Sequence, residues 1–193
     1  FNNNSIICVG DVMYDVFLSV FKKLKKNKKS FNILVTLHRP MNTNSKTRML
    51  NIIKNLNKLS NTHSILFPIH PRTKKLLVKY QIHKLLSKKI KVVKPLSYKN
   101  ILYYLKNAKL LITDSGGMQK EAFFCKTQTL TIRDTTEWPE TVLQNWNRLI
   151  QPVGLKIYEY SLKRILLSGK KSRPYGNGLA SKKIIKELKK LCI

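Results

Sequence analysis

The stretch LLITDSGGMQKEAFF, residues 110–124, changes character in its middle. An apolar run typical of a buried strand precedes Asp114-Ser115-Gly116-Gly117, and a run typical of a helix follows. The chain has only seven glycines, so two adjacent ones at this junction need a reason. A helix N-terminus carries unbonded N–H groups and a partial positive charge, and glycines there let an anion approach the backbone. The stretch therefore predicts a phosphate site; the alternative is a tight turn that needs positive φ.

On both sides of this junction, short β-rich runs alternate with longer amphipathic runs. Strands are predicted over residues 5–10, 31–38, 63–70, 89–93, 109–113, 127–132 and 146–151. Helices are predicted over residues 11–26, 45–60, 71–86, 97–108, 118–125, 139–144, 156–168 and 179–193, with Ser45 and Ser97 as N-caps. This alternation indicates βαβ units and predicts an α/β fold with a doubly wound, Rossmann-like parallel sheet.

Polar residues follow four of the predicted strands at the point where each strand ends. They are His38-Arg39, His70-Pro71-Arg72, the glycine turn at 114–117, and Arg133-Asp134. Because doubly wound sheets bind ligands outside the carboxyl ends of their strands, these residues are expected to share one site.

Each of these side chains has a functional and a structural interpretation. Ser115 can donate a hydroxyl hydrogen bond to a phosphate held by Gly116 and Gly117. His38 is a candidate phosphate ligand or general acid, although a lone histidine is commonly structural. Arg39 beside it favours the anion-binding interpretation, and we expect His70 and Arg72 to lie behind this first pair.

Glu121 lies one turn into the helix that follows the glycines. A carboxylate there cannot pair with a phosphate, but it can accept hydrogen bonds from ribose hydroxyls, as the acidic residue of dinucleotide folds does. The alternative is a solvated helix residue that complements the helix dipole.

The charge of the chain is extreme, with a formal net charge of +29. A polyanion partner and a lysine-rich overall composition both account for it, and the scarcity of arginine among the basic residues favours composition. Five of the nine acidic residues fall within residues 114–140. Carboxylates repel phosphates, so this clustering argues against a nucleic-acid-binding face there.

Composition also limits the class of protein. The 42% hydrophobic content is typical of a globular protein, and no apolar run reaches the ~18 residues of a membrane span. The three cysteines are scattered without a CxxC pair, so neither a metal site nor a disulfide framework is expected. The N-terminal residues lack a basic n-region, so we expect no secretory signal and a cytoplasmic protein.

Six motifs, taken together, resemble the non-hydrolysing UDP-N-acetylglucosamine 2-epimerase family in order and spacing. They are TLHRPMN (36–42), PIHPRT (68–73), PLSY (95–98), ITDSGGMQKEA (112–122), IRDTTEWPETV (132–142) and RPYGNG (173–178). The resemblance covers nearly the whole chain, but it corresponds only to the second, C-terminal, UDP-binding domain of the family.

The resemblance implies one half of a glycosyltransferase-B-type two-domain fold. Family enzymes interconvert UDP-GlcNAc and UDP-ManNAc by eliminating UDP and adding it back, without metal or cofactor. The implied catalytic residue is His38, near the diphosphate or sugar. The implied substrate-binding residues are Arg39, Ser115, Gly116, Gly117, Glu121 and Arg133.

The implied organisation has three parts. Residues 1–30 would form an inter-domain strand, helix and basic linker, residues 31–168 the Rossmann-like UDP-binding domain, and residues 169–193 a loop and C-terminal helix. The family's carboxylates for proton transfer lie in the first domain, so this chain alone is expected to bind UDP without epimerising. A separate chain carrying the first domain is a candidate partner, and the resemblance also implies a homodimer.

Two details depart from the common family pattern or point to a branch of it. Met41 stands where HRxEN is common, and QKEAFF and TEW are closer to the branch acting on UDP-diacetamido-uronic acid sugars. That branch is one alternative activity. A UDP-sugar glycosyltransferase and a catalytically inactive nucleotide-binding domain are the others.

Overall fold

The computed structural model describes residues 6–24, 31–162 and 173–191. The chain divides into two compact units. The larger is Lys26–Gly169, and the smaller combines Phe1–Lys25 with Lys170–Ile193. Each unit is described separately below.

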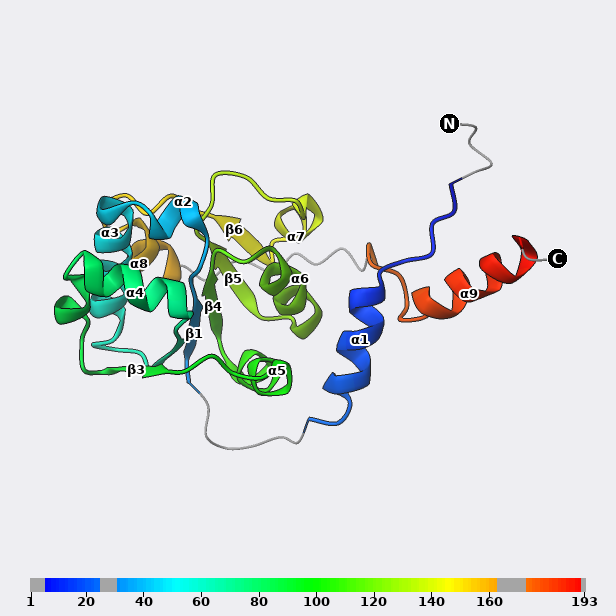
Figure 1. The fold of residues 1–193 in the computed structure, drawn as a ribbon, viewed down its shortest axis with the longest axis horizontal. Helices are drawn as coiled ribbons and strands as arrows, with labels where there is room; N and C mark the ends of the chain where they lie inside the picture. The colour runs from blue at the N-terminus through cyan, green and yellow to red at the C-terminus, as the bar shows by residue number, and fades with distance from the viewer. Residues whose placement is uncertain (1–5, 25–30, 163–172, 192–193) are drawn as a thin grey trace. The chain divides into compact units, whose positions relative to one another are not determined.

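The described part of the larger unit contains a six-stranded sheet in which every pairing is parallel (Figure 1). The strand order is β3-β2-β1-β4-β5-β6. The strands are β1 (Ile33–Thr36), β2 (Ile65–Pro68), β3 (Ile90–Val93), β4 (Leu110–Thr113), β5 (Gln128–Thr131) and β6 (Asn147–Leu149). The predicted α/β fold with a doubly wound parallel sheet is confirmed.

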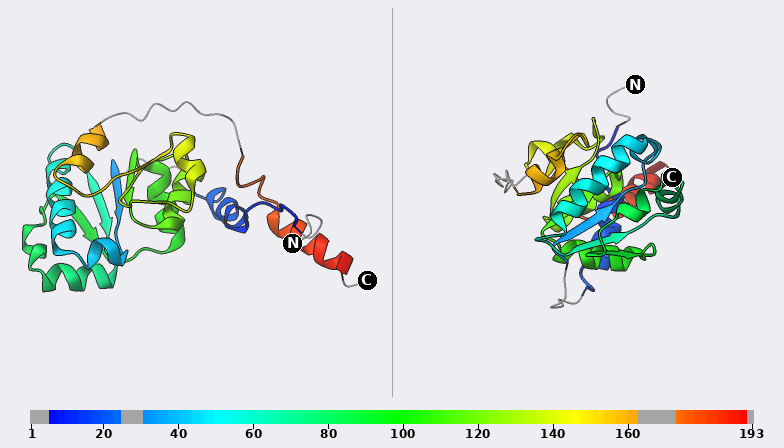
Figure 2. Two further views of the ribbon diagram at one scale, coloured as in Figure 1. Left: turned by 90° about the horizontal axis from the view of Figure 1, so that it is seen from above. Right: turned by 90° about the vertical axis from the view of Figure 1, so that its left-hand side faces the viewer.

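Helices cover both faces of this sheet (Figure 2). They are α2 (Pro40–Thr43), α3 (Lys46–Leu59), α4 (Pro71–Lys79), α5 (Tyr98–Asn107), α6 (Gly116–Cys125), α7 (Pro139–Leu143) and α8 (Lys156–Leu162), with the 3₁₀ helix η2 (Ile82–Leu85) after α4. Contacts join α3 to α8 and α5 to α6. The helix predicted over 71–86 is wrong in its middle, because Gln81 adopts a left-handed conformation with φ of 61°.

The core lies between the sheet and these helices. All four residues of β2 and of β4 are buried, as expected for parallel strands covered on both faces. On α3 the apolar positions recur at helical spacing, and Met49, Ile52 and Leu56 are fully buried against the sheet. Each such side chain contributes about 1.5–3 kcal/mol on burial. This core fixes the positions of the strand ends.

The smaller unit pairs two helices from opposite ends of the chain, α1 (Val12–Phe21) and α9 (Ala180–Leu191). Asp15 of α1 accepts hydrogen bonds from the backbone N–H groups of Ala180, at 3.1 Å, and Ser181, at 2.7 Å, where α9 begins. The strand predicted over 5–10 is wrong in its described part, 6–10. There Gly10 has φ of +99° and packs against the 175–176 backbone instead of pairing in a sheet.

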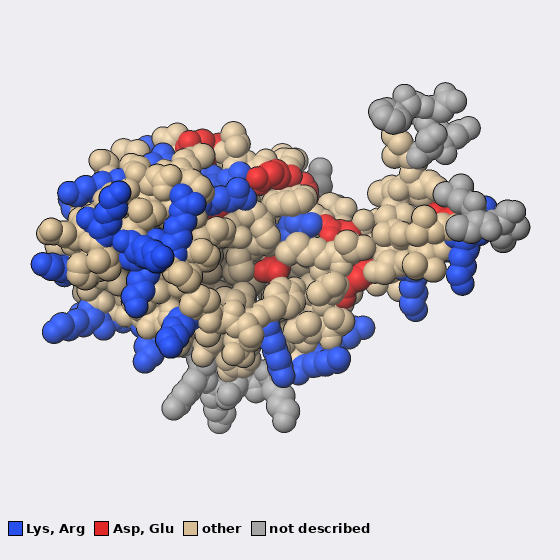
Figure 3. Space-filling model, in the orientation of Figure 1, with Lys and Arg blue, Asp and Glu red and all other residues tan. Residues whose placement is uncertain are grey.

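Charge is distributed unevenly over the larger unit. Residues 16–113 contain no aspartate or glutamate. On the face drawn in Figure 3, lysines and arginines gather over α3 and α4, and acidic side chains lie on the side of α6 and α7. Among the described residues, no helix is long and apolar enough to cross a membrane.

Candidate nucleotide site

The two central strands, β1 and β4, end side by side. Their register pairs Thr36 with Thr113, and the two hydroxyl oxygens lie 2.6 Å apart in a hydrogen bond. From these ends the chain continues to α3 on one face of the sheet and to α6 on the other. A crevice at such a reversal of strand order is where doubly wound folds bind ligands.

Asp114 holds the loop after β1 against the end of β4. Its carboxylate is fully buried and accepts hydrogen bonds from the backbone N–H groups of His38 and Arg39, each at 3.0 Å. The side-chain amide of Asn42 donates to the same carboxylate at 3.1 Å and to the carbonyl oxygen of Ile132 at 2.9 Å. These bonds tie together the loops after β1, β4 and β5. The role of Asp114 in this structure is therefore to position neighbouring residues.

The glycines at the start of α6 are helical. Neither Gly116 nor Gly117 has a positive φ, so the alternative of a turn that needs positive φ is wrong. A Cβ added at Gly116 would lie 3.5 Å from its nearest neighbours, an ordinary contact distance. Alanine would thus fit there and would favour the helix. The fold therefore does not require glycine at this position.

Ser115 is the N-cap of α6, and its hydroxyl oxygen accepts a hydrogen bond from the N–H of Met118 at 3.4 Å. The N–H groups of the two glycines belong to the first turn, which has no intrahelical acceptors. With the helix dipole, they form a ready anion site.

Two arginines approach this helix terminus and share one carboxylate. The guanidinium of Arg133 donates two hydrogen bonds to Glu137, at 2.6 and 2.8 Å. A guanidinium nitrogen of Arg39 lies 3.9 Å from the same carboxylate, and both Arg39 and Glu137 lie beside the Cβ position of Gly116. The hydrogen bonds from Arg133 lower the pKa of Glu137 to about 2. The buried Asp114 carboxylate also acts on Arg133, so two carboxylates face the two guanidinium groups. The positive groups that remain for an anion are the N–H groups of the first turn.

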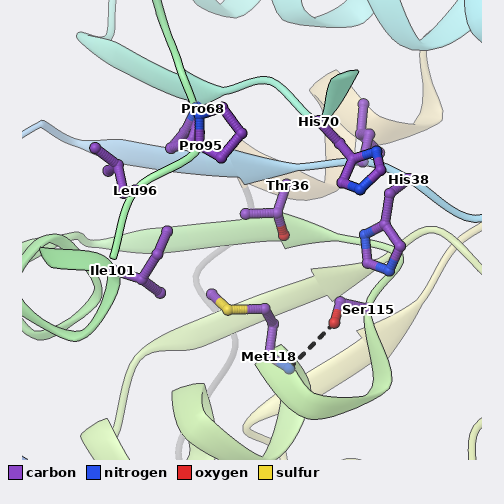
Figure 4. A pocket seen from close by; sticks show the side chains of 10 residues that line it. Thr36, His38, Pro68, His70, Pro95, Leu96, Ile101, Ser115 and Met118 are labelled. Carbon is purple, nitrogen blue, oxygen red and sulfur yellow. Dashed lines mark hydrogen bonds between the residues drawn. The ribbon is translucent and has the colours of Figure 1, made fainter. Parts of the chain in front are cut away.

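A cavity of about 180 Å³ opens beside this terminus. Figure 4 shows the rings of His38 and His70 together with Ser115 at its polar end. The ring centroids of the two histidines are 5.9 Å apart, and Nδ1 of His38 lies 3.6 Å from a carboxylate oxygen of Asp114. The remaining walls are largely apolar, from Pro68, Pro95, Leu96, Ile101 and Met118. The cavity therefore has one polar end and largely apolar walls.

Glu121 lies on the next turn of α6 and is only 7% exposed. Burial raises its pKa to about 7, although Tyr98 and Lys120 both favour the ionised form. Glu121 does not line the cavity itself, but Met118, three residues earlier on the same helix, does. Tyr98 and Ile101 have the same relation on α5. Glu121 and Tyr98 therefore lie one helical turn away from Met118 and Ile101, which line the cavity.

The structure gathers most of the side chains that the sequence predicted for one site. His38, Arg39, Ser115, Gly116 and Arg133 surround the start of α6, and Glu121 lies one turn further on. Sequence reasoning placed His70 behind His38, but both rings line the cavity. It named neither Ile101 nor Met118, two apolar residues that also line the cavity.

One protein family matches nearly the whole chain. The sequence profile of the family described as UDP-N-acetylglucosamine 2-epimerase matches residues 1–189. The chain belongs to this family. The resemblance inferred from the sequence motifs is thereby confirmed.

Relatives in the family match along almost the whole chain. A UDP-N-acetylglucosamine 2-epimerase homolog of Methanococcus maripaludis is 39% identical over 98% of this chain and 56% of its own length. The UDP-2,3-diacetamido-2,3-dideoxy-D-glucuronate 2-epimerase of Pseudomonas aeruginosa is 34% identical over 96% of this chain and 53% of its own. The chain thus spans about half the length of the curated relatives it matches.

A solved structure of the family has the same fold. The UDP-GlcNAc 2-epimerase of Methanocaldococcus jannaschii, in complex with UDP-GlcNAc and UDP, superposes with a TM-score of 0.86 at 35% identity. The match covers 98% of this chain and 56% of that one. The α/β unit described here therefore corresponds to one half of a glycosyltransferase-B-like epimerase.

Proposed function

We propose that residues 31–168 form the UDP-binding domain of an enzyme that inverts C2 of a UDP-N-acetylhexosamine, interconverting UDP-GlcNAc and UDP-ManNAc. The start of α6 is the observation that carries the proposal. Two helical glycines stand there, of which Gly116 has room for a Cβ in the fold, and two arginines lie alongside. Family membership and the UDP and UDP-GlcNAc in the Methanocaldococcus jannaschii relative support the identity of the ligand.

The diphosphate would bind at the start of α6. The N–H groups of Gly116 and Gly117 and the hydroxyl of Ser115 face the anion, and Arg39 and Arg133 supply charge-assisted hydrogen bonds. Glu121 would accept hydrogen bonds from the ribose hydroxyls. His38, at the polar end of the cavity, would contact the diphosphate or the sugar as the catalytic residue of this domain.

The proposed reaction places new negative charge beside the N–H groups at the start of α6 and the two guanidinium groups. Removal of the C2 proton and cleavage of the C1–O bond leave a double bond between C1 and C2, and the bonding electrons of C1–O pass to the diphosphate oxygen. Fixed N–H groups and guanidinium groups stabilise such developing charge more than they stabilise the bound substrate. Re-addition of UDP after the proton returns on the opposite face gives the epimer.

The second candidate substrate is a UDP-2,3-diacetamido uronic acid. The Pseudomonas aeruginosa relative, at 34% identity, favours it, as does Trp138 in the TEW motif. The two substrates share the UDP moiety, so the proposed contacts of α6 are the same for both.

Calorimetric titration with UDP at ~0.3 M salt tests the proposal, because that salt screens non-specific attraction between lysines and phosphate. UMP and a DNA oligomer are the comparators. We expect saturable UDP binding that exceeds both. Binding that collapses with salt, or that DNA matches, would contradict a nucleotide site and favour an inactive, polyanion-binding domain.

A further inference from the structure

The side chain of Gln119 is the centre of a buried polar network between α6 and the loop after β5. Gln119 is only 1% exposed. Its carbonyl oxygen accepts hydrogen bonds from the hydroxyl of Thr136, at 2.6 Å, and from the side-chain amide of Asn147, at 2.9 Å. Its own amide donates to the backbone carbonyl oxygen of Ser115, the N-cap of α6, at 3.4 Å. Gln119 therefore joins the start of α6 to the loop after β5 and to β6.

The Thr136 hydroxyl makes two hydrogen bonds in a defined direction. Its one proton goes to Gln119, and its oxygen accepts the backbone N–H of Trp138 at 3.0 Å. Glu137 lies between these two residues, and its carboxylate receives both hydrogen bonds from the guanidinium of Arg133. The Thr136 hydroxyl thus fixes the backbone on both sides of the residue that holds Arg133.

The other side of the network is anchored in the core. The hydroxyl of Thr131 donates to the carbonyl oxygen of the Asn147 side chain at 2.7 Å, and the Asn147 amide also donates to the hydroxyl of Thr141 at 3.1 Å. All three residues are buried, and they belong to β5, β6 and α7. A buried network whose groups are satisfied is rigid. Gln119 therefore offers Thr136 an acceptor with a fixed position.

The segment that this network supports has no regular structure. Residues 132–138 form neither helix nor strand. A charged group on such a loop binds a ligand well only where rigid elements hold it in the productive geometry. The hydrogen bond from Thr136 to Gln119 joins this loop directly to α6, the helix whose first turn is proposed to bind the diphosphate.

We infer that Gln119 and Thr136 are positioning residues of the diphosphate site, whose hydrogen bond holds the loop after β5 so that Glu137 and, through it, Arg133 stand at the start of α6. This inference rests on the proposed function, because it takes Arg133 as a ligand of the diphosphate. It adds to that function two residues that touch no ligand themselves.

The test is a double-mutant cycle on UDP affinity with Thr136→Val and Arg133→Ala. Valine replaces the Thr136 hydroxyl with a methyl group of similar size, and we expect about tenfold weaker UDP binding, on the scale of the hydrogen bonds lost. Adding Thr136→Val to Arg133→Ala should cause no further loss, because the guanidinium that Thr136 positions is already absent. A merely structural role would give the same loss in both backgrounds, and that additive result would overturn the inference.

Three further variants control for damage to the loop. Thr136→Ser keeps the hydroxyl and should bind UDP nearly as the original protein does. Thr135→Val makes the valine substitution at the exposed neighbouring threonine and should leave UDP affinity unchanged. Gln119→Met keeps the length of the side chain without its acceptor and should reproduce the loss seen in Thr136→Val. Equal losses in the two valine variants, or full affinity in Gln119→Met, would contradict the positioning role.

The single variants distinguish failure of this inference from failure of the proposed function. If Arg133→Ala weakens UDP binding and Thr136→Val does not, the inference is wrong and the diphosphate assignment stands. If Arg133→Ala has no effect, Arg133 is not a ligand of the diphosphate and the inference is wrong with it. If the original protein binds no UDP, the proposed function itself is wrong.

Discussion

Asp114 fixes the local geometry of the strand ends, because its carboxylate accepts hydrogen bonds from donors that follow β1. Replacing it with alanine would leave the N–H groups of His38 and Arg39 and the amide of Asn42 without their buried acceptor. Unsatisfied buried donors cost about 1–3 kcal/mol, so we expect Asp114→Ala to lower the free energy of unfolding by roughly 2–4 kcal/mol.

Denaturant unfolding measures this change. Asp134→Ala, at an exposed aspartate in the loop after β5, is the control and should alter stability by less than about 0.5 kcal/mol. Equal effects of the two variants would mean that the hydrogen bonds of Asp114 contribute little to the folded state.

Glu121 should make stability depend on pH. Its pKa is raised from 4.5 to about 7 in the folded protein, so between these values the folded state binds a proton that the unfolded state has lost. The contribution of Glu121 to stability is therefore fully present below pH 4.5 and is lost as the pH rises through about 7. Glu121→Gln, which stays neutral, should be more stable than the original protein at pH 8 by about 1–3 kcal/mol, and nearly equal at pH 4.5.

Unfolding of both proteins across this pH range, by denaturant, gives the two stability curves. If the difference between the two curves stays constant with pH, the pKa of Glu121 is not raised by burial in the folded protein.

Single residues also show where sequence reasoning stops. The sequence identified Asp114 and Glu121 as acids in a chain that has few, and it placed both at the site. It did not distinguish them by burial, because burial depends on how the loops after β1, β4 and β5 and the helices α5 and α6 pack. The closeness of Tyr98 to Glu121 depends on the same packing.

At the scale of elements, a substitution in the first turn of α6 should affect stability and ligand binding in opposite directions. Gly116→Ala should keep or slightly raise stability, by up to about 1 kcal/mol, because alanine favours helix and its Cβ fits. The same methyl group would stand where a phosphate approaches the N–H groups, so UDP affinity should fall tenfold or more.

Thermal unfolding and UDP titration of the same sample test this pair of effects. Gly154→Ala is the opposite control: Gly154 has φ of +55° in open space, so alanine should cost about 1 kcal/mol of stability and leave UDP affinity unchanged. Unchanged UDP binding in Gly116→Ala would remove the start of α6 from the site.

The elements of the larger unit follow the sequence closely because their signals are local. Each of its six strands lies inside a predicted range, and Ser45 and Ser97 are N-caps as predicted. The short helix α2 escaped prediction because four residues carry no periodicity. The break at Gln81 escaped it because no glycine or proline marks the left-handed residue.

At the scale of the whole molecule, information from the sequence is weakest where distant segments meet. Asp15 hydrogen-bonds to Ser181, 166 positions away, and no sequence motif at either residue predicts that pairing. The charge asymmetry is visible in the sequence as the acid-free stretch 16–113. Where this stretch lies in the fold depends on the strand order, which places β1, β2 and β3 together. The five acids within residues 114–140 lie after β4 and β5.

The share of the relatives that this chain spans leads to a prediction about activity. Epimerisation needs a base that removes the C2 proton, and the carboxylates nearest the proposed site already have partners. Asp114 accepts backbone N–H groups, Glu121 is buried beside Lys120 and Tyr98, and Glu137 pairs with Arg133. The chain spans 56% of its Methanococcus maripaludis relative, so a base from the remaining half is expected. We therefore expect the chain alone to bind UDP-GlcNAc without exchanging the C2 hydrogen.

Incubation with UDP-GlcNAc in deuterated water, followed by NMR of the sugar, measures this exchange directly. We expect no deuterium at C2 with the chain alone. Exchange is expected when a chain carrying the remaining half of a family enzyme is supplied, because the base and the diphosphate site then act on one substrate. Exchange by the chain alone that Glu121→Gln or Glu137→Gln abolishes would instead place the base in this domain. In that case the contacts that hold these carboxylates in the ligand-free protein would have to break when the substrate binds.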